Sequence, residues 1–277
     1  MTIERHHGSE APGHTAGAEE HAVSAYTVDG VQLYYEVHGD GPPLLLIHGD
    51  YAMLETWLGT IPALMEHFTV IAPERRGHGR SYDGTERFTY ELFADDMAAL
   101  LGHLGLERAV VVGHSGGANT ALMMAYKYPD MVEKLVGMST WFNGAGSTYD
   151  HWQATIGGPD PSWLPEEALR YWHLVNPMGA EYFPIFLQKM YDLGEYPTLT
   201  PRDLATIRTP ILVVAGDRDW MRFDHTLTLF ESVWRHPDPA EDARRRQLFI
   251  VPGQGHMFPY EKPELVNGVI LDFLLER

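Results

Sequence analysis

One stretch of the chain constrains its fold more than any other: an apolar run that ends abruptly in a Gly-x-Ser-x-Gly sequence. The run Ala109 to Val112 predicts a buried strand, and the small-residue segment Ala118 to Ala125 predicts a helix. Between them stand Gly113, Ser115 and Gly117. A turn this tight forces a strained backbone on the serine, which only small neighbours accommodate. Ser115 is therefore expected above the carboxyl end of its strand.

This turn has a chemical use, because it presents a hydroxyl beside backbone donors. The N–H of Gly116 is expected at the positive N-terminal end of the helix, aimed at any oxyanion formed at Ser115. A serine hydroxyl is a poor nucleophile until a base removes its proton, and that base needs a third group to fix its tautomer. The other members of such a set are expected at neighbouring strand ends.

Strand and helix patterns alternate along the chain. Asp29-Gly30 favours a hairpin between the strands Tyr26 to Val28 and Val31 to Val37. Continuous apolar runs predict buried strands at Leu44 to Ile47, Phe68 to Ala72, Ala109 to Val112, Leu135 to Met138, Ile211 to Ala215 and Leu248 to Val251. Helical patterns cover Tyr90 to Leu104, Ser115 to Tyr128 and Pro263 to Leu275. This order predicts an α/β fold with a mostly parallel, doubly wound sheet of about eight strands, whose ligand crevice lies at the carboxyl ends.

Two segments depart from this alternation. Aromatic residues concentrate between Trp141 and Ile207 without a buried-strand pattern, which predicts a helical cap at residues 141–207 over an apolar pocket. The cap interrupts a core of residues 23–140 and 208–277. Residues 1–22 lack periodicity and an apolar centre, so they predict a flexible tail rather than a signal peptide. Their irregularly spaced histidines do not favour a metal site.

Composition narrows the classes of function. A formal charge of −18 disfavours a nucleic-acid partner and an anionic membrane surface. The chain has no Cys, which excludes a thiolate nucleophile and Cys-ligated metal and suits a reducing cytoplasm. No apolar run reaches the roughly 18 residues that span a bilayer. We expect a cytoplasmic protein with a small-molecule substrate; the oligomeric state stays open.

Candidates for the base and the acid follow two further strands. Asp217 and Asp219 come after the strand Ile211 to Ala215, and His256 comes after the strand Leu248 to Val251. The order Ser, Asp, His is the order of hydrolases built on a nucleophile elbow, and differs from that of chymotrypsin or subtilisin.

With these motifs the chain resembles the α/β-hydrolase-fold serine hydrolases from about Val23 to Leu275. The motifs in register are His48-Gly49, Glu74 to Ser81, the serine turn, Gly216 to Asp219, and Gly255-His256. The resemblance implies a catalytic triad of Ser115, Asp219 and His256, with Asp217 an exposed turn residue. It also implies that the backbone N–H groups of Gly116 and Asp50 form the oxyanion hole. No cofactor and no metal are implied.

Asp50 departs from the family pattern, in which this position carries a small, aromatic or amide residue. A carboxylate there opposes an oxyanion unless its side chain turns away, hydrogen-bonds locally or stays protonated. Alternatively, it selects a substrate with a cation or a hydroxyl donor.

The remaining polar residues are assigned to structure first. His48 is expected to set the oxyanion loop and His78 to stabilise a turn. Glu91, Asp95 and Asp96 are expected on a solvated helix, and the segment His236 to Arg246 in a surface loop. The predicted substrate pocket consists of Tyr51, His114, Trp141, Trp152, Trp172, Trp220 and Met257.

Together these features predict a serine hydrolase that cleaves an ester, thioester or lactone of a small, largely apolar molecule through an acyl-enzyme at Ser115. One alternative is a carbon–carbon bond hydrolase acting on a β-diketone-like substrate. Another is a non-hydrolytic ligand-binding protein or cyclase on the same fold, since fold does not decide function.

Overall fold

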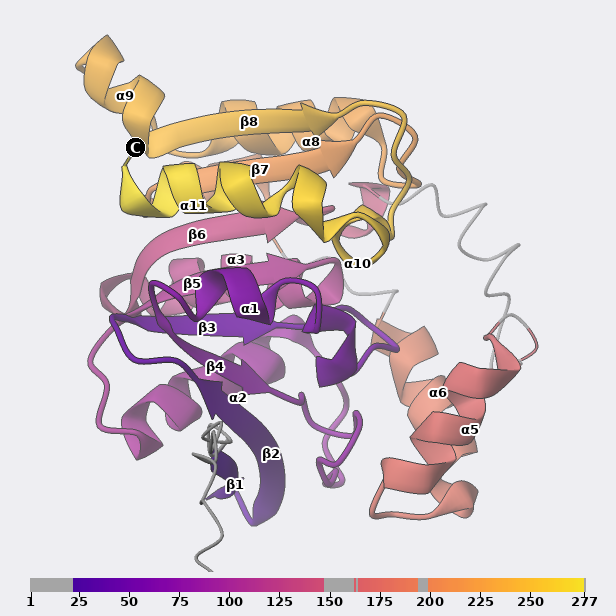
Figure 1. Cartoon of the computed structure of the whole chain (residues 1–277). Helices are drawn as coiled ribbons and strands as arrows, with labels where there is room; N and C mark the ends of the chain where they lie inside the picture. Colours follow the sequence, from indigo (N-terminus) through magenta and orange to yellow (C-terminus); the bar gives the residue numbers. More distant parts are fainter. Residues whose placement is uncertain (1–21, 147–161, 163, 194–198, 277) are drawn as a thin grey trace, which may run out of the picture.

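The computed structural model describes residues 22–146, 162, 164–193 and 199–276 (Figure 1). Their centre is an eight-stranded sheet in the order β1-β2-β4-β3-β5-β6-β7-β8. The strands are β1 (Ala22–Val28), β2 (Val31–His38), β3 (Pro43–Ile47), β4 (Thr69–Pro73), β5 (Ala109–His114), β6 (Val132–Met138), β7 (Ile211–Gly216) and β8 (Arg246–Val251). Strand β2 pairs antiparallel with β1 and β4, and the pairs from β4 to β8 are parallel. This confirms the predicted mostly parallel sheet.

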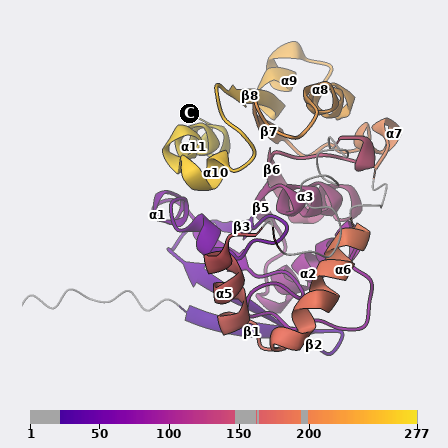
Figure 2. The same cartoon turned by 90° about the vertical axis from the view of Figure 1, so that its right-hand side faces the viewer.

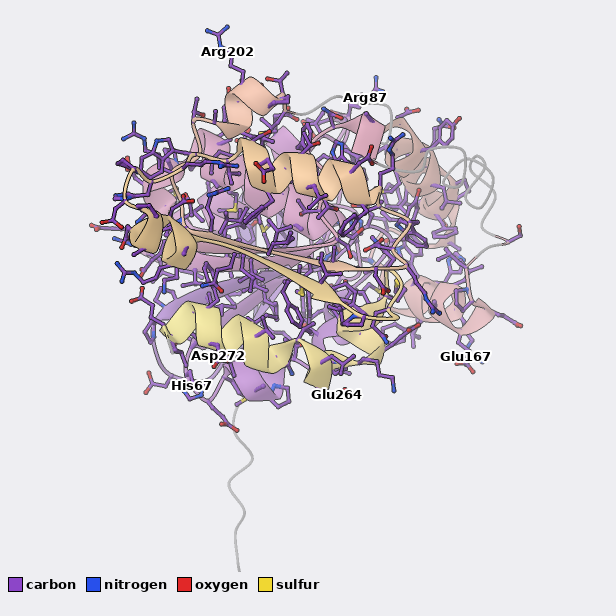
Figure 3. The ribbon with its side chains drawn as sticks, turned by 90° about the horizontal axis from the view of Figure 1, so that it is seen from above. His67, Arg87, Glu167, Arg202, Glu264 and Asp272 are labelled. Atoms are coloured by element: carbon purple, nitrogen blue, oxygen red, sulfur yellow. The ribbon has the colours of Figure 1, made fainter. Side chains whose placement is uncertain are left out.

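The central strands are apolar throughout because both of their faces are covered. In β3, Leu45 and Ile47 join the hydrophobic core on one face, and Leu44 and Leu46 join the core on the other. Helices α2 (Tyr90–His103), α3 (Gly116–Lys127) and α8 (Phe223–Ser232) contribute to the first core. Helices α1 (Ile61–Leu64), α10 (Phe258–Glu261) and α11 (Asn267–Leu275) contribute to the second. Figure 3 shows the sheet between these layers, with Asp272 of α11 pointing outward.

Two helices lie beyond the carboxyl ends of the strands. They are α5 (Glu166–Val175) and α6 (Phe183–Leu193), and Figure 2 looks onto this end of the molecule. Trp172 of α5 packs against the rings of Phe183 and Phe186 of α6, at centroid distances of 4.6 and 5.6 Å. The remaining short elements are α7 (Pro201–Leu204), α9 (Pro239–Arg245), η1 (Leu54–Trp57), η2 (Pro129–Met131), η3 (Gly144–Gly146), η5 (Ala180–Tyr182) and η6 (Pro263–Leu265).

Hydrogen bonds hold α6 and the residues between the two helices to the loop that follows β4. The hydroxyl of Tyr182 donates to Asp83 Oδ2 at 2.6 Å, and Lys189 Nζ lies 2.5 Å from the same oxygen. Asn176 Nδ2 donates to the carbonyl of Gly79 at 3.0 Å. The loop is therefore tied to the segment that carries α5 and α6, beyond the carboxyl ends of the strands.

The structure corrects some sequence predictions. Asp96 does not face solvent: it is 1% exposed and bonded twice to the buried Arg76, at 2.7 and 3.0 Å. The segment His236 to Arg246, predicted as a loop, contains helix α9, which Asp238 caps by accepting hydrogen bonds from two backbone N–H groups. The helix predicted from Pro263 begins as the 3₁₀ turn η6, and α11 begins at Asn267. In the described part of the chain, no helix is long and apolar enough to cross a membrane.

Candidate active site

Ser115 stands at the junction between β5 and α3, in a backbone conformation that non-glycine residues rarely adopt. Its φ is 54° and its ψ is −127°, and it is the N-cap of α3. A Cβ on Gly117 would lie 2.2 Å from the carbonyl oxygen of Ile47, so the junction requires glycine there. The strained turn predicted from the Gly-x-Ser-x-Gly sequence is therefore present.

The structure brings the three residues of the predicted triad into one chain of hydrogen bonds. His256 Nδ1 lies 2.8 Å from Asp219 Oδ1, and His256 Nε2 lies 2.9 Å from Ser115 Oγ. Since a carboxylate only accepts, Nδ1–H donates to Asp219 and Nε2 accepts from the serine hydroxyl. Ser115 and His256 are each 6% exposed. The serine proton therefore points at an unprotonated nitrogen.

Asp219 has two further donors. The Ser139 hydroxyl donates to Oδ2 at 2.5 Å, and the N–H of Met221 donates to Oδ1 at 3.0 Å. Burial alone would raise the pKa of Asp219, but the hydrogen bonds from His256 and from these two donors hold it below its usual value. The carboxylate therefore stays ionised beside the imidazole. Ser139 was not predicted from the sequence; it follows β6, which lies between the strands that carry Ser115 and Asp219.

His114 lies beneath His256, with ring centroids 4.7 Å apart. Its Nε2 donates to the backbone carbonyl of His256 at 2.9 Å, so its Nδ1 accepts from the Tyr260 hydroxyl at 2.7 Å. Tyr260 in turn accepts from the N–H of Gly49 at 3.2 Å. Burial lowers the pKa of His114 to about 3, so the ring is neutral. His114 and Tyr260 thus connect the loop after β3 to the loop that carries His256.

The Asp50 side chain hydrogen-bonds locally, which is one of the alternatives that the sequence left open. Its Oδ1 accepts from Arg75 Nη2 at 2.8 Å, and its Oδ2 accepts from the Tyr90 hydroxyl at 2.9 Å. The side chains of Arg75 and Asp50 are 0% and 5% exposed. The carboxylate is therefore held by donors from two other elements of the fold.

His48 supports the same loop. The N–H of Arg75 donates to His48 Nε2 at 3.1 Å, so Nδ1 donates to the carbonyl of Gly49 at 2.8 Å. Burial and the nearby charge of Arg75 lower the pKa of His48 to about 3. His78, also fully buried, has its pKa lowered by burial and by Arg75. Both rings are in the structural positions predicted for them.

A cavity of about 270 Å³ opens at Ser115 and His256. Of the predicted pocket residues, Tyr51, His114, Trp220 and Met257 line it, and the Trp220 ring stacks on His256 at 4.1 Å. Sequence reasoning missed several lining residues: Met53, Glu55, Thr56, Leu164, Pro165, Ala168 and Tyr260.

The other predicted pocket tryptophans differ in position. Trp172 is 5% exposed within the contacts between α5 and α6, because its ring fills the space between these two helices. Trp141 packs edge-on against Tyr90, with ring centroids 6.1 Å apart. Neither belongs to the described lining of the cavity, and Trp152 lies outside the described residues.

Comparison with known proteins decides the family. A family model described as "alpha/beta hydrolase fold" matches residues 42–170. The protein named "Putative carbamate hydrolase RutD" of Caulobacter sp. (strain K31) is 32% identical over 278 residues, which cover 90% of this chain and 97% of that protein. The chain belongs to the α/β hydrolase family. This α/β hydrolase is also 36% identical to a "Putative esterase/lipase" of Haemophilus influenzae, over 84% of this chain and 83% of the relative.

A solved structure extends the likeness over nearly the whole fold. A hydrolase from Pseudomonas aeruginosa PA01 superposes with a TM-score of 0.68 at 26% identity, over 93% of this chain and 99% of that one. The chain is therefore an enzyme, a hydrolase of the α/β fold.

In this α/β hydrolase, the cavity is connected to α5 by an ionic network. Glu55, which lines the cavity, accepts from the Tyr171 hydroxyl of α5 at 2.6 Å and from Arg80. Arg80 Nη1 also donates to Glu74 Oε1 at 2.6 Å. Among the described residues, no group of His, Cys, Asp and Glu side chains has the arrangement of a metal site.

Proposed function

We propose that this α/β hydrolase is a serine hydrolase that cleaves an ester, thioester or lactone of a small, largely apolar molecule. The observation that carries the proposal is the continuous chain of hydrogen bonds from Asp219 through His256 to Ser115. A base placed 2.9 Å from a hydroxyl, and oriented by a carboxylate, is the arrangement that makes serine nucleophilic.

The reaction follows from the direction of these hydrogen bonds. Ser115 Oγ attacks the acyl carbon while its proton passes to His256 Nε2, and ionised Asp219 stabilises the imidazolium. The N–H groups of Gly116 and Asp50 bind the oxyanion. As the intermediate collapses, the imidazolium proton passes to the leaving oxygen or sulfur, and the acyl group stays on Ser115. His256 then deprotonates a water molecule that attacks the acyl-enzyme ester. As this intermediate collapses and the acid leaves, the imidazolium returns the proton to Ser115 Oγ.

The cavity indicates the size and polarity of the acyl group. Its volume of about 270 Å³ is slightly below the range usual for small-molecule sites, roughly 300 to 1,000 Å³. Trp220, Met257, Leu164 and Ala168 supply apolar walls. We propose that residues 141–207 are the cap of this site and residues 23–140 and 208–277 its core, since α5 contributes Ala168 to the lining.

The names of the relatives support acyl chemistry and widen the set of substrates to be tested. One relative is named as a carbamate hydrolase and another as an esterase or lipase, so carbamates belong beside esters in the assay. The cytoplasmic location expected from the cysteine-free sequence stays a prediction.

The test is turnover of p-nitrophenyl esters from acetyl to decanoyl, and of matched carbamates, by the wild type and by Ser115→Ala. We expect turnover of short acyl chains that Ser115→Ala abolishes, and labelling of wild-type Ser115 by a fluorophosphonate. Two aspartates in the turn after β7 provide a variant and its matched control. Asp219→Asn should lower kcat by about 10⁴-fold, whereas exposed Asp217→Asn should change it less than about twofold.

Equal turnover by wild type and Ser115→Ala would refute the acyl-enzyme. Labelling of Ser115 without turnover of any ester or carbamate would refute the substrate class and favour the carbon–carbon hydrolase. Binding of an apolar ligand without labelling or turnover would favour the binding protein or cyclase.

A further inference from the structure

A carboxylate lies directly against the proposed oxyanion hole. A Cβ on Gly116 would lie 1.9 Å from Asp50 Oδ1, so the Asp50 side chain occupies the space beside the residue whose N–H faces the oxyanion. Asp50 also lines the cavity that contains Ser115. A negative charge this close opposes the charge that develops on the substrate oxygen, because a largely buried site screens charges weakly.

The counter-charge comes from a single buried arginine. Arg75 is fully buried, and its Nη2 donates to Asp50 Oδ1 at 2.8 Å. The guanidinium carbon lies 4.8 Å from the centroid of the Phe93 ring, while Nε and Nη1 have no hydrogen-bond partner in the described part of the chain. The two side chains thus depend on each other: the guanidinium has Asp50 as its ion-pair partner, and the carboxylate has Arg75 as its cation.

The neighbouring polar groups do not supply a positive charge to Asp50. His48 accepts from the backbone N–H of Arg75 and is neutral, and His78 is fully buried. The Tyr90 hydroxyl supplies the second donor to Asp50, at 2.9 Å. Asp50 follows β3, Arg75 follows β4, and Tyr90 begins α2, so the contacts connect three elements around the loop.

We propose that Arg75, assisted by Tyr90, is a positioning residue of the oxyanion hole. It neutralises the Asp50 carboxylate and holds it away from the substrate, which leaves the backbone N–H of Asp50 to bind the oxyanion. This inference rests on the proposed function, because it requires an oxyanion to form at Ser115.

The test is a double-variant cycle of Asp50→Asn and Arg75→Met, with kcat and KM measured on an ester that the wild type hydrolyses. Arg75→Met leaves the carboxylate without its cation, so we expect kcat to fall by about 100-fold with KM changed less than about threefold. Adding Asp50→Asn removes the unpaired charge, so the double variant should recover to within about tenfold of the wild type.

If Arg75 had only a structural role, adding Asp50→Asn to Arg75→Met would not restore kcat. Losses that multiply in the double variant would overturn the proposal, and so would wild-type kcat in Arg75→Met. Should Arg75→Met not fold, the double variant decides alone. A folded double variant within about tenfold of wild-type kcat supports the proposal, and a folded but inactive one overturns it.

Ser115→Ala in the same assay separates the two proposals. Turnover that survives Ser115→Ala refutes the proposed function itself. An inactive Ser115→Ala together with an unaffected Arg75→Met refutes only the role of Arg75.

Discussion

Acidification should destabilise this protein well above the pH at which its paired carboxylates titrate. His48, His78 and His114 are fully buried, and burial lowers the pKa of His48 and His114 to about 3 and that of His78 well below its usual value. In the unfolded chain the same rings titrate near pH 6.5. The unfolded state therefore binds more protons than the folded state between these values, so stability falls as pH falls.

The size of this loss depends only on the pKa of histidine in the unfolded chain, as long as the pH stays above the pKa values of the buried rings in the folded state. Each ring costs about 2 kcal/mol of folding free energy between pH 7 and pH 5, or about 6 kcal/mol for the three together. Glu74 changes the stability in the opposite direction. Burial raises its pKa to about 7, so its protonation in the folded state between pH 7 and pH 5 stabilises the fold by about 2 kcal/mol. For these four groups the net loss is about 4 kcal/mol, which corresponds to a fall in Tm of about 10 °C. His225, whose pKa burial lowers to about 4, changes the stability in the same direction.

Thermal unfolding followed by circular dichroism between pH 8 and pH 5 measures this loss. His78→Met removes one of the three rings, whose Nε2 has no hydrogen-bond partner among the described residues, and should flatten the pH dependence by about 2 kcal/mol. His173→Gln, at an exposed position on α5, is the control and should leave the dependence unchanged. A Tm at pH 5 within about 2 °C of its value at pH 7 would refute the reasoning.

Other residues give sharper local tests. Asp96→Ala removes the buried partner of Arg76 and leaves the half-exposed Glu86, 3.3 Å from Arg76 Nη1, as its remaining ion-pair partner among the described residues. We expect a cost of about 3 kcal/mol of unfolding free energy in urea, whereas Asp95→Ala, at a side chain 44% exposed, should cost less than about 1 kcal/mol; equal losses would contradict the burial argument. Ser139→Ala removes a donor to Asp219 and should lower kcat by about tenfold, an expectation that an unchanged kcat would exclude. Tyr260→Phe removes the donor to His114 and should lower kcat about tenfold with KM nearly constant, so a rise confined to KM would indicate a binding role instead.

Much of the fold could be predicted from local sequence, because strands that are buried on both faces appear as continuous apolar runs. Continuous apolar runs such as Leu44 to Ile47 have few alternatives to a central parallel strand. The serine turn was predictable because the Gly-x-Ser-x-Gly sequence itself supplies the glycine that the turn requires. At Gly117 the backbone of β3 leaves no room for a Cβ. Ser115, Asp219 and His256 meet because each follows the end of a parallel strand.

The environment of Asp50 was beyond such reasoning. Its partners Arg75 and Tyr90 are 25 and 40 residues away, and no spacing rule connects two loops and the start of a helix whose meeting depends on the packed sheet. Asp96 was misplaced because a charged residue on a helix usually faces water, and its partner Arg76 lies 20 residues earlier. Trp172 was misassigned because an aromatic side chain in a helical segment serves helix packing as well as it serves a pocket.

The attachment of α5 and α6 has a consequence for exchanging parts between related hydrolases. Their anchors, Asp83 and the carbonyl of Gly79, belong to the same loop as Arg75, the partner of Asp50. A chimera that imports only residues 141–207 would join foreign helices to a loop shaped for others. We expect an active chimera only when α5 and α6 are exchanged together with residues 74–84.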